Sequence, residues 1–209
     1  MIRLYDYWRS SASYRVRIAL ALLGLEWDSV PVNLLDGSHR AADNLERNPQ
    51  GLVPSLDIDG LILTQSLAII EYLNDTRGGG LLPDDPANKA RVRALSYAVA
   101  MEIHPICNLS VGKYAVEQSA GGITTEGWMK HFIAKGLIAL EDMLSGQATG
   151  RFSHGDAPTM ADLCLVPQMY NARRWGVDLA SLPRIVAIDA AMAELEAVQA
   201  AHPDRWGST

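Results

Sequence analysis

The sequence has few cysteines and lacks long apolar runs. Among its 209 residues, Cys107 and Cys164 are the only cysteines, and each lies within an apolar stretch. Two distant thiols provide neither a disulfide framework nor metal-ligand spacing, so we expect two buried free thiols, a reducing compartment and no bound metal. No run of 18 apolar residues occurs, and the opening MIRLYDYWRSS lacks the apolar core of a signal peptide. We therefore expect a cytoplasmic protein that does not span a membrane.

Basic residues are also in the minority. Lysine and arginine number 18 against 24 acidic residues, and the formal net charge is −6. This balance argues against a nucleic-acid-binding surface, although it leaves room for a small basic pocket that binds an anionic substrate. The apolar share of 48% and charged share of 20% are those of an ordinary globular protein. A chain of this length can form one large domain or two small ones.

The first 80 residues alternate between strand-like and helix-like patterns. Asp59-Gly60 separates two short apolar segments and predicts a hairpin turn, while Gly24 ends a segment rich in helix formers. The resulting order β-α-β-α-β-β-α is typical of a thioredoxin-like α/β domain, which we place at residues 1–80. The predicted elements are residues 1–6, 15–23, 27–34, 41–47, 56–58, 61–63 and 66–75.

Strand patterns disappear after a proline- and aspartate-rich linker at residues 81–86. The remainder predicts an all-helical domain at residues 87–209. Thr159 and Asp162 have the spacing of a capping box at a helix start, and Pro183 suits a first helical turn. The predicted helices are residues 87–116, 125–144, 160–175 and 183–200.

Serines crowd the junction between the first predicted strand and helix. Ser10, Ser11 and Ser13 lie where free backbone N–H groups and the helix dipole favour an anion, such as the thiolate of a bound thiol. Plain helix capping by serine is the alternative reading. A thioredoxin-type oxidoreductase would have Cys-x-x-Cys at this turn, and this chain has none. Any reactive thiol must therefore come from a ligand.

Two further positions suggest contacts with a peptide. Pro54 precedes a predicted strand, and a cis Val53–Pro54 bond would leave the Val53 backbone free to pair with an extended ligand; an edge-strand proline is the alternative. Gln65 and Ser66 open the third predicted helix, where they either hold a carboxylate or serve as a cap. A thiol site, a peptide-backbone site and a carboxylate site together match the three groups of glutathione.

Several segments resemble the zeta class of glutathione transferases along nearly the whole chain. These are SSASYRVRIALALLGLEW, NPQGLVPSLDIDG, QSLAIIEYL, NLSVGKY and GDAPTMADLCLVPQMYNARRWGVDL. The resemblance implies a thioredoxin-like domain followed by an all-α domain, a homodimer, and a glutathione-dependent isomerase of maleylacetoacetate in aromatic amino acid catabolism. In that reaction, glutathione thiolate adds reversibly to the cis double bond of a small dicarboxylate substrate.

The resemblance also implies roles for individual residues. Ser10 or Ser11 would contact the glutathione sulfur, and Arg174, with Arg9, would face substrate carboxylates. The remaining implied contacts are with glutathione itself. Val53 would pair with its cysteinyl part, Gln65 and Ser66 with its γ-glutamyl end, His39 with its glycyl end, and His104, Asn108, Leu109 and Ser110 would approach it from the helical domain.

The sequence departs from the family pattern at two positions and leaves other functions open. Ala12 replaces the usual cysteine of the SSCS motif, and His104 stands where many relatives have glutamine. We still expect activity, since serine and a helix N-terminus can stabilise a thiolate. Alternatives are maleylpyruvate isomerisation, transfer or dehalogenation with α-halo acids, and a non-catalytic binding module. Arg173 neighbours Arg174 on the same helix and is expected to be a solvated charge.

Overall fold

The computed structural model describes residues 1–146 and 148–207, which form two compact units. The first unit combines Met1–Leu82 with the C-terminal segment that begins at Ala193, and the second is Pro83–Met192. The sequence-based domain limits of 1–80 and 87–209 differ at the C-terminus, and they stay a prediction. Leu81 and Leu82, at the start of the expected linker, are buried, and both donate their N–H groups to Asn74 Oδ1 at 3.1 Å.

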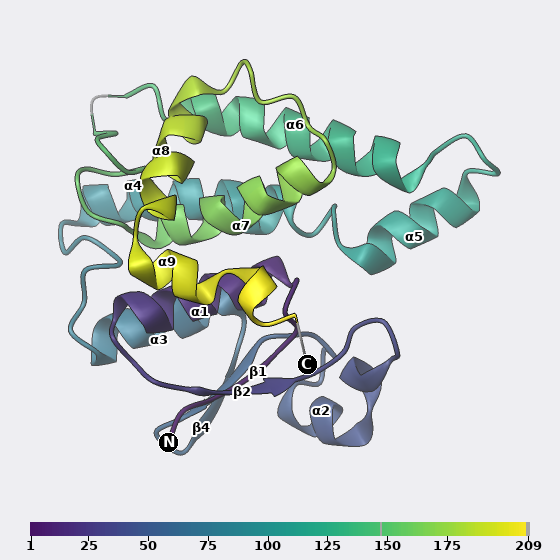
Figure 1. Cartoon of the computed structure of the whole chain (residues 1–209), viewed down its shortest axis with the longest axis horizontal. Helices are drawn as coiled ribbons and strands as arrows, with labels where there is room; N and C mark the ends of the chain where they lie inside the picture. Colours follow the sequence, from purple (N-terminus) through teal and green to yellow (C-terminus); the bar gives the residue numbers. More distant parts are fainter. Residues whose placement is uncertain (147, 208–209) are drawn as a thin grey trace. The chain divides into compact units, whose positions relative to one another are not determined.

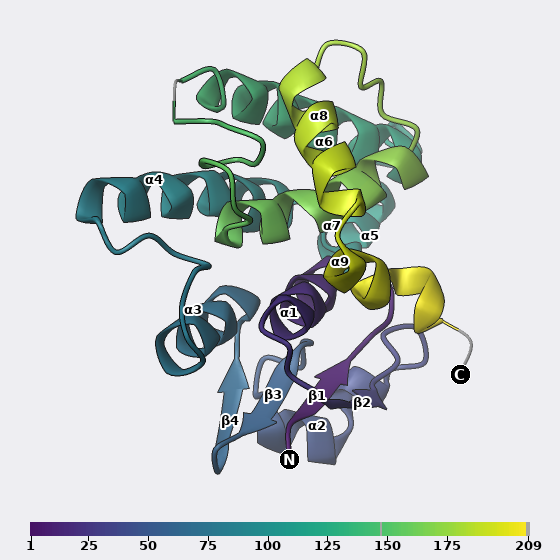
Figure 2. The same cartoon turned by 60° about the vertical axis from the view of Figure 1, so that its left-hand side comes forward.

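The first unit is built on a four-stranded sheet with the order β2-β1-β3-β4 (Figure 2). β1 is parallel to β2 and antiparallel to β3, and β3 and β4 form the expected hairpin with positive φ angles at Asp59 and Gly60. The predicted order of strands and helices is confirmed. The strands are β1 (Arg3–Asp6), β2 (Asp28–Pro31), β3 (Ser55–Ile58) and β4 (Leu61–Thr64).

Helices α1 (Ser11–Leu22) and α3 (Ser66–Thr76) pack together on one face of this sheet (Figures 1 and 2). Gly24 follows α1 with φ +65°, a left-handed conformation that glycine adopts without steric cost. α9 (Glu196–Ala201) lies beside α1 in both views, so this part of the C-terminal segment packs against the first unit. The other short helices of this unit are η1 (Ser38–Arg40), α2 (Ala42–Arg47), α9 (Glu196–Ala201) and η3 (Pro203–Arg205).

The second unit is helical, and its helix boundaries correct two predictions. The single helix expected at residues 87–116 is divided, because a π-helical segment follows α4 and Pro105 lacks the N–H that a continuous helix needs. The helix expected at 183–200 also divides, at Glu194 and Leu195. Leu195 has an extended backbone although no breaker residue marks it. The elements are α4 (Pro86–Tyr97), η2 (Ala98–Ile103), α5 (Leu109–Gln118), α6 (Thr125–Met143), α7 (Met160–Arg174) and α8 (Pro183–Ala193).

The predicted capping box at the start of α7 is confirmed. Asp162 is fully buried, and its carboxylate accepts the Thr159 N–H at 2.8 Å and the Ser153 N–H at 2.7 Å. Burial raises the pKa of the Asp162 carboxyl, and these hydrogen bonds oppose that rise. Both cysteines are free and buried, as expected. None of the helices in the described part of the chain combines the length and apolarity required to cross a bilayer.

Candidate functional site

Ser10 caps the N-terminus of α1. A turn precedes the helix, in which Ser10 N–H donates to Tyr7 O at 2.9 Å, and Ser10 Oγ accepts the Ser13 N–H at 3.2 Å. Ser11 is the first helical residue and is buried. No acidic residue lies in the first turn. Capping is therefore confirmed, and no carboxylate of the first turn itself competes for the positive end of the helix dipole.

Val53 presents backbone groups without partners just before β3. The Val53–Pro54 peptide bond is cis, and the Val53 side chain packs with Tyr7 and Val32. Among residues 1–146 and 148–207, no backbone hydrogen bond is formed by the N–H or C=O of Val53. Because such groups are normally paired, this position can accept an extended peptide ligand.

Gln65 and Ser66 form the start of α3. Gln65 adopts φ +68°, an uncommon conformation for a residue with a side chain, and its Nε2 donates to Gln50 Oε1 at 2.7 Å. Ser66 is buried, and its Oγ accepts a hydrogen bond from Arg15 Nη1 at 3.2 Å. As at α1, the first turn of α3 contains no acidic residue. The position therefore combines a helix N-terminus with a nearby guanidinium, both of which favour a carboxylate.

Arg15 is a residue that our sequence reasoning missed. It lies within the apolar helical run RVRIALALL and is only 2% exposed. A charged residue in the middle of such a run is unusual, because burying a charge requires partners. That pattern was a usable indication that Arg15 serves a polar site rather than the surface.

His39 and Arg9 lie in a short helix and a turn of the first unit, respectively. His39 belongs to η1, and its backbone oxygen accepts from Asn44 Nδ2 at 2.8 Å. Its Nδ1 is buried and has no hydrogen-bond partner among the described residues. The Arg9 guanidinium lies 4.7 Å from the centroid of the Trp8 ring and donates to the Tyr7 hydroxyl at 3.2 Å. Arg9 is therefore oriented by aromatic neighbours.

The candidates of the second unit lie at helix ends. His104 follows η2, and its N–H donates to Val99 O at 2.9 Å. Asn108 caps α5, because its Oδ1 accepts from the N–H of Ser110 at 3.0 Å and from the hydroxyl of Ser110 at 2.9 Å. Asn108 and Ser110 thus have a structural role that the sequence did not indicate.

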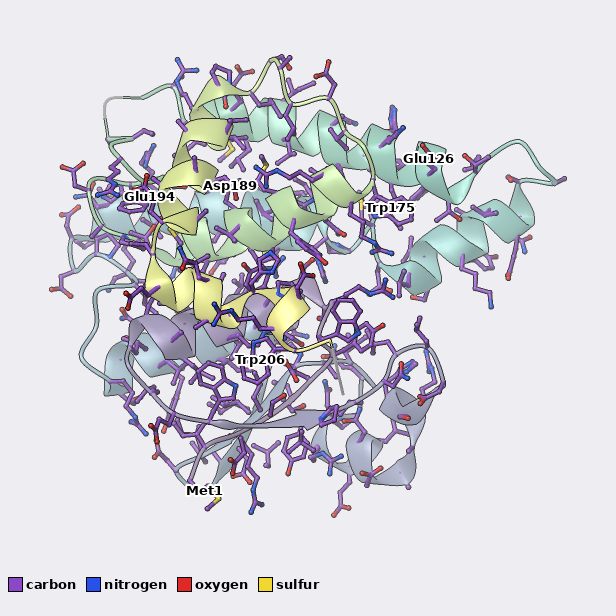
Figure 3. All side chains as sticks on the ribbon, in the orientation of Figure 1. Met1, Glu126, Trp175, Asp189, Glu194 and Trp206 are labelled. Carbon is purple, nitrogen blue, oxygen red and sulfur yellow. The ribbon has the colours of Figure 1, made fainter. Side chains whose placement is uncertain are left out.

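Arg173 and Arg174 differ clearly at the end of α7. Arg173 Nη2 pairs with Asp189 Oδ2 of α8 at 2.5 Å and its side chain is 52% exposed, so the expected solvated charge also has an ion-pair partner. Burial raises the pKa of the Asp189 carboxyl, and Arg173 counteracts this. Arg174 is exposed, and its guanidinium lies 5.0 Å from the centroid of the ring of Trp175. Figure 3 labels Trp175 and also Asp189, the partner of Arg173. Since Arg173 is engaged by Asp189, Arg174 is the better candidate for a substrate carboxylate.

The candidates of the first unit are linked through shared contacts. Tyr7, whose carbonyl accepts the Ser10 N–H, packs against Val53. Arg15 of α1 reaches Ser66 of α3. The structure thus links the serine turn to the cis-proline segment through Tyr7, and links α1 to the start of α3 through Arg15.

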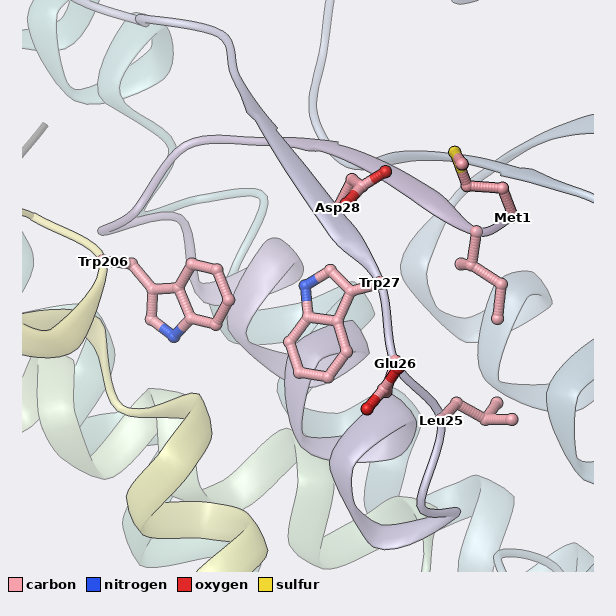
Figure 4. A pocket seen from close by; sticks show the side chains of 7 residues that line it. Met1, Leu25, Glu26, Trp27, Asp28 and Trp206 are labelled. Carbon is pink, nitrogen blue, oxygen red and sulfur yellow. The ribbon is translucent and has the colours of Figure 1, made fainter.

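A separate hollow lies at the opposite end of β1 (Figure 4). It has a volume of about 670 Å³ and contains none of the predicted site residues. Trp27 and Trp206 stack in its wall with ring centroids 5.5 Å apart. Because Met1 and Ile2 precede β1 while Ser10 follows it, the hollow is distinct from the serine turn. The lining residues are Met1, Ile2, Leu25, Glu26, Trp27, Asp28 and Trp206.

Comparisons with known proteins identify the family of this chain. Residues 1–75 match the family model described as glutathione S-transferase, N-terminal domain. Maleylacetoacetate isomerase from Rhizobium meliloti (strain 1021) is 64% identical over 204 residues, which cover 97% of this chain and 96% of that protein.

Solved structures give the same result. A holo structure of maleyl pyruvate isomerase, described as a bacterial glutathione-S-transferase in the zeta class, superposes with a TM-score of 0.90 at 41% identity, covering 96% of both chains. Maleylacetoacetate isomerase from Methylobacterium extorquens AM1, with bound malonate and glutathione, gives a TM-score of 0.91 at 41% identity and covers 97% of both chains. The chain therefore belongs to the maleylacetoacetate isomerase family of zeta-class glutathione transferases.

Proposed function

We propose that this protein is a glutathione-dependent cis-trans isomerase of maleylacetoacetate. The observation that carries the proposal is the 64% identity to the Rhizobium meliloti maleylacetoacetate isomerase along nearly the full length of both chains. The first unit supports it with three features expected of a site for a thiol tripeptide. These are the serine-capped start of α1, the unpaired backbone of Val53, and the start of α3 with Arg15 beside Ser66.

The residues present fit glutathione as cofactor. The unpaired backbone of Val53 suits the cysteinyl peptide group, and the start of α3 with Ser66 and Arg15 suits the γ-glutamyl carboxylate. The buried Nδ1 of His39, which has no partner within the described residues, offers a further polar contact for the glycyl end. Gln65, Asn108, Ser110 and His104 are proposed as additional contacts.

The thiol group would lie at the N-terminus of α1. Glutathione supplies the nucleophilic thiolate that adds reversibly to the cis double bond. The hydroxyl of Ser10 or Ser11 would donate a hydrogen bond to the sulfur there, and the N–H groups of the first turn favour negative charge. Comparable sites lower a thiol pKa from about 8.5 to roughly 3.5–7.5, which raises the fraction of thiolate at neutral pH. Ala12 adds no thiol of its own, so the chemistry requires only the bound one.

Arginine side chains are proposed to orient the dicarboxylate substrate. Arg174 is exposed beside Trp175, and its planar guanidinium can pair with a carboxylate through two hydrogen bonds. Arg9, oriented by Trp8 and Tyr7, is the second proposed cation. Holding the carboxylates fixes the double bond relative to the nucleophile, which is an orientation effect.

We further propose a cytoplasmic homodimer that acts in aromatic amino acid catabolism. Strand β4 is an edge of the sheet, and its Leu61 and Ile62 are each more than 40% exposed. Exposed apolar side chains on an edge strand favour coverage by a partner. Sedimentation at several concentrations tests this part, and a monomer at micromolar concentration would refute it.

The enzymatic proposal is tested by steady-state kinetics with maleylacetoacetate. We expect isomerisation that saturates with glutathione and falls to the uncatalysed rate without it. Isomerisation at full rate in the absence of glutathione would refute the mechanism. S-methylglutathione is the matched control, because it keeps the peptide contacts and removes the thiol.

Maleylpyruvate is the second candidate substrate. A solved neighbour at a TM-score of 0.90 carries the maleyl pyruvate isomerase name, so the same architecture serves this shorter acid. A side-by-side comparison of kcat/KM for the two acids decides between them, and we expect the larger value for maleylacetoacetate. An assay of halide release from α-halo acids tests the alternative function, glutathione transfer with dehalogenation.

A further inference from the structure

Helix α1 carries a second buried arginine, Arg17, which the proposed mechanism does not use. It is 0% exposed and donates hydrogen bonds to three separate parts of the first unit. Its Nη1 pairs with Asp6 Oδ2 of β1, its Nε donates to Ala201 O of α9 at 3.1 Å, and its Nη2 donates to Trp8 O at 2.8 Å. A single planar guanidinium thus joins a strand, the C-terminal segment and the turn before α1.

The Trp8 carbonyl lies in the middle of the turn that presents Ser10. This turn begins at Tyr7, whose carbonyl accepts the Ser10 N–H at 2.9 Å, and Ser10 then caps α1 through the Ser13 N–H. Since Arg17 holds the Trp8 carbonyl, it restrains the backbone that sets the direction of the Ser10 hydroxyl. Arg17 itself lies about two helical turns after Ser10 and would not touch a ligand there.

The C-terminal segment also contacts Arg17 and the turn before α1. The Trp206 ring centroid lies 5.9 Å from the Arg17 guanidinium, and the Trp206 Nε1 donates to Ala200 O at 3.1 Å. Gly207 lies so close to Trp8 that an added Cβ would be 3.1 Å from the indole ring. Trp8 is therefore held at its carbonyl by Arg17 and contacted at its ring by the end of the chain.

We propose that Arg17 is a positioning residue that couples the C-terminal segment to the serine turn. The fork of the guanidinium supplies three donors in fixed directions, which the single ammonium group of a lysine cannot reproduce. The proposal rests on the proposed function in one respect, since the group positioned is the one that would hold the glutathione thiolate. The coupling between the C-terminal segment and the serine turn can be measured in the free protein, without any ligand.

The test compares Arg17→Lys with Ser29→Ala. Ser29 is the matched control, because its Oγ donates to Asp6 Oδ1 at 2.8 Å in the same buried network, and no hydrogen bond joins it to the turn or the C-terminal segment within the described residues. Hydrogen exchange of peptides covering residues 7–13 is followed in the free proteins. We expect exchange about ten-fold faster in Arg17→Lys and unchanged in Ser29→Ala.

A second readout concerns the thiol. Thiolate absorbance near 240 nm gives the pKa of bound glutathione, and we expect Arg17→Lys to raise that pKa by about one unit, a ten-fold change in the ionisation equilibrium. kcat should fall about ten-fold, while the KM for the substrate changes little. A merely structural role would lower the melting temperature of both variants without moving the thiol pKa in either.

A chain that ends at His202 keeps the Ala201 carbonyl and removes Trp206 and Gly207. It provides the second variant should Arg17→Lys not fold, and we expect two- to five-fold faster exchange at residues 7–13. Unchanged exchange in both altered chains, or equal changes in Ser29→Ala, would overturn the coupling. If glutathione does not bind the unaltered protein, the proposed function fails, yet the exchange data still decide whether Arg17 couples the two segments.

Discussion

The two units hold their candidate polar groups in different ways. In the first unit, the candidates depend on backbone features and buried bonds, such as the starts of α1 and α3 and the Arg15–Ser66 hydrogen bond. In the second unit, Arg174 lies exposed at the end of its helix. Free N–H groups at a helix start belong to the backbone and survive most substitutions, whereas an exposed side chain can be exchanged freely. The first unit therefore offers mainly backbone groups and buried hydrogen bonds at its candidate positions, and the second unit offers an exposed guanidinium.

The largest expected effect tests the first unit. The Ser10 hydroxyl accepts the Ser13 N–H, and its own proton remains available to a thiolate. Ser10→Ala removes both interactions. We expect kcat/KM to fall 100- to 1,000-fold, as for loss of one donor to a developing anion, with about 1 kcal/mol of stability lost with the cap. Ser11→Ala is the control, since Ser11 is not the cap, and we expect a much smaller loss of activity. The reverse ranking would assign the sulfur contact to Ser11.

The second-largest expected effect is a loss of stability when the capping box of α7 in the second unit is removed. Asp162→Ala leaves the buried N–H groups of Thr159 and Ser153 without their acceptor. We expect a loss of about 3 kcal/mol in the free energy of unfolding, or roughly 6–12 °C in Tm. Asp156→Ala is the control. Asp156 is exposed and accepts one N–H at 3.2 Å, so its loss should stay within about 0.5 kcal/mol. Equal Tm changes in the two variants would contradict the capping box.

A third prediction concerns a buried thiol of the second unit. Burial raises the pKa of the Cys107 thiol to about 11. The unfolded chain releases this proton near pH 9, so unfolding is favoured as the pH rises from about 9 to about 11, by up to about 2.7 kcal/mol. Urea titrations at both ends of this interval measure the effect, and Cys107→Ala should reduce it. Rapid alkylation of the native protein at pH 8 would contradict a buried thiol.

The smallest expected effect distinguishes the neighbouring arginines. Arg174→Ala should raise the KM for maleylacetoacetate about ten-fold, equivalent to about 1.4 kcal/mol, and leave the Kd of glutathione unchanged. Arg173→Ala should lower Tm, because Asp189 loses its ion pair, with little change in KM. A larger KM effect at Arg173 would mean that the substrate cation was assigned to the wrong side chain.

Much of the fold follows from local patterns. Alternating strand and helix patterns predicted the β-α-β-α-β-β-α order, and the Thr159–Asp162 spacing predicted the start of α7. The break between η2 and α5 was missed although Pro105 marks it in the sequence, and the break at Leu195 was missed because no breaker residue marks it. The positive φ of Gln65 was equally invisible, since side chains rarely adopt it and no glycine marks it.

The polar site was predictable only in part. Serines at a helix start and a proline before a strand are local signs, and they predicted Ser10, Ser11, Val53 and Ser66 as candidates. The capping role of Asn108 towards Ser110 and the pairing of Arg173 with Asp189 were not predicted. The second pair lies sixteen residues apart, and such a contact depends on how two helices pack.

By itself, the sequence determined the element order, the family and the residue types available for binding an anionic thiol. These depend on near neighbours in the chain, where periodicity, capping and turn preferences act directly. Only the tertiary structure decided which partners the buried Arg15 and Arg17 find, that the C-terminal segment packs on α1, and that Trp8 contacts both Arg17 and Gly207. Ala201 and Arg17 are 184 residues apart, and their contact exists only because the folded core excludes water and leaves each buried donor in need of an acceptor.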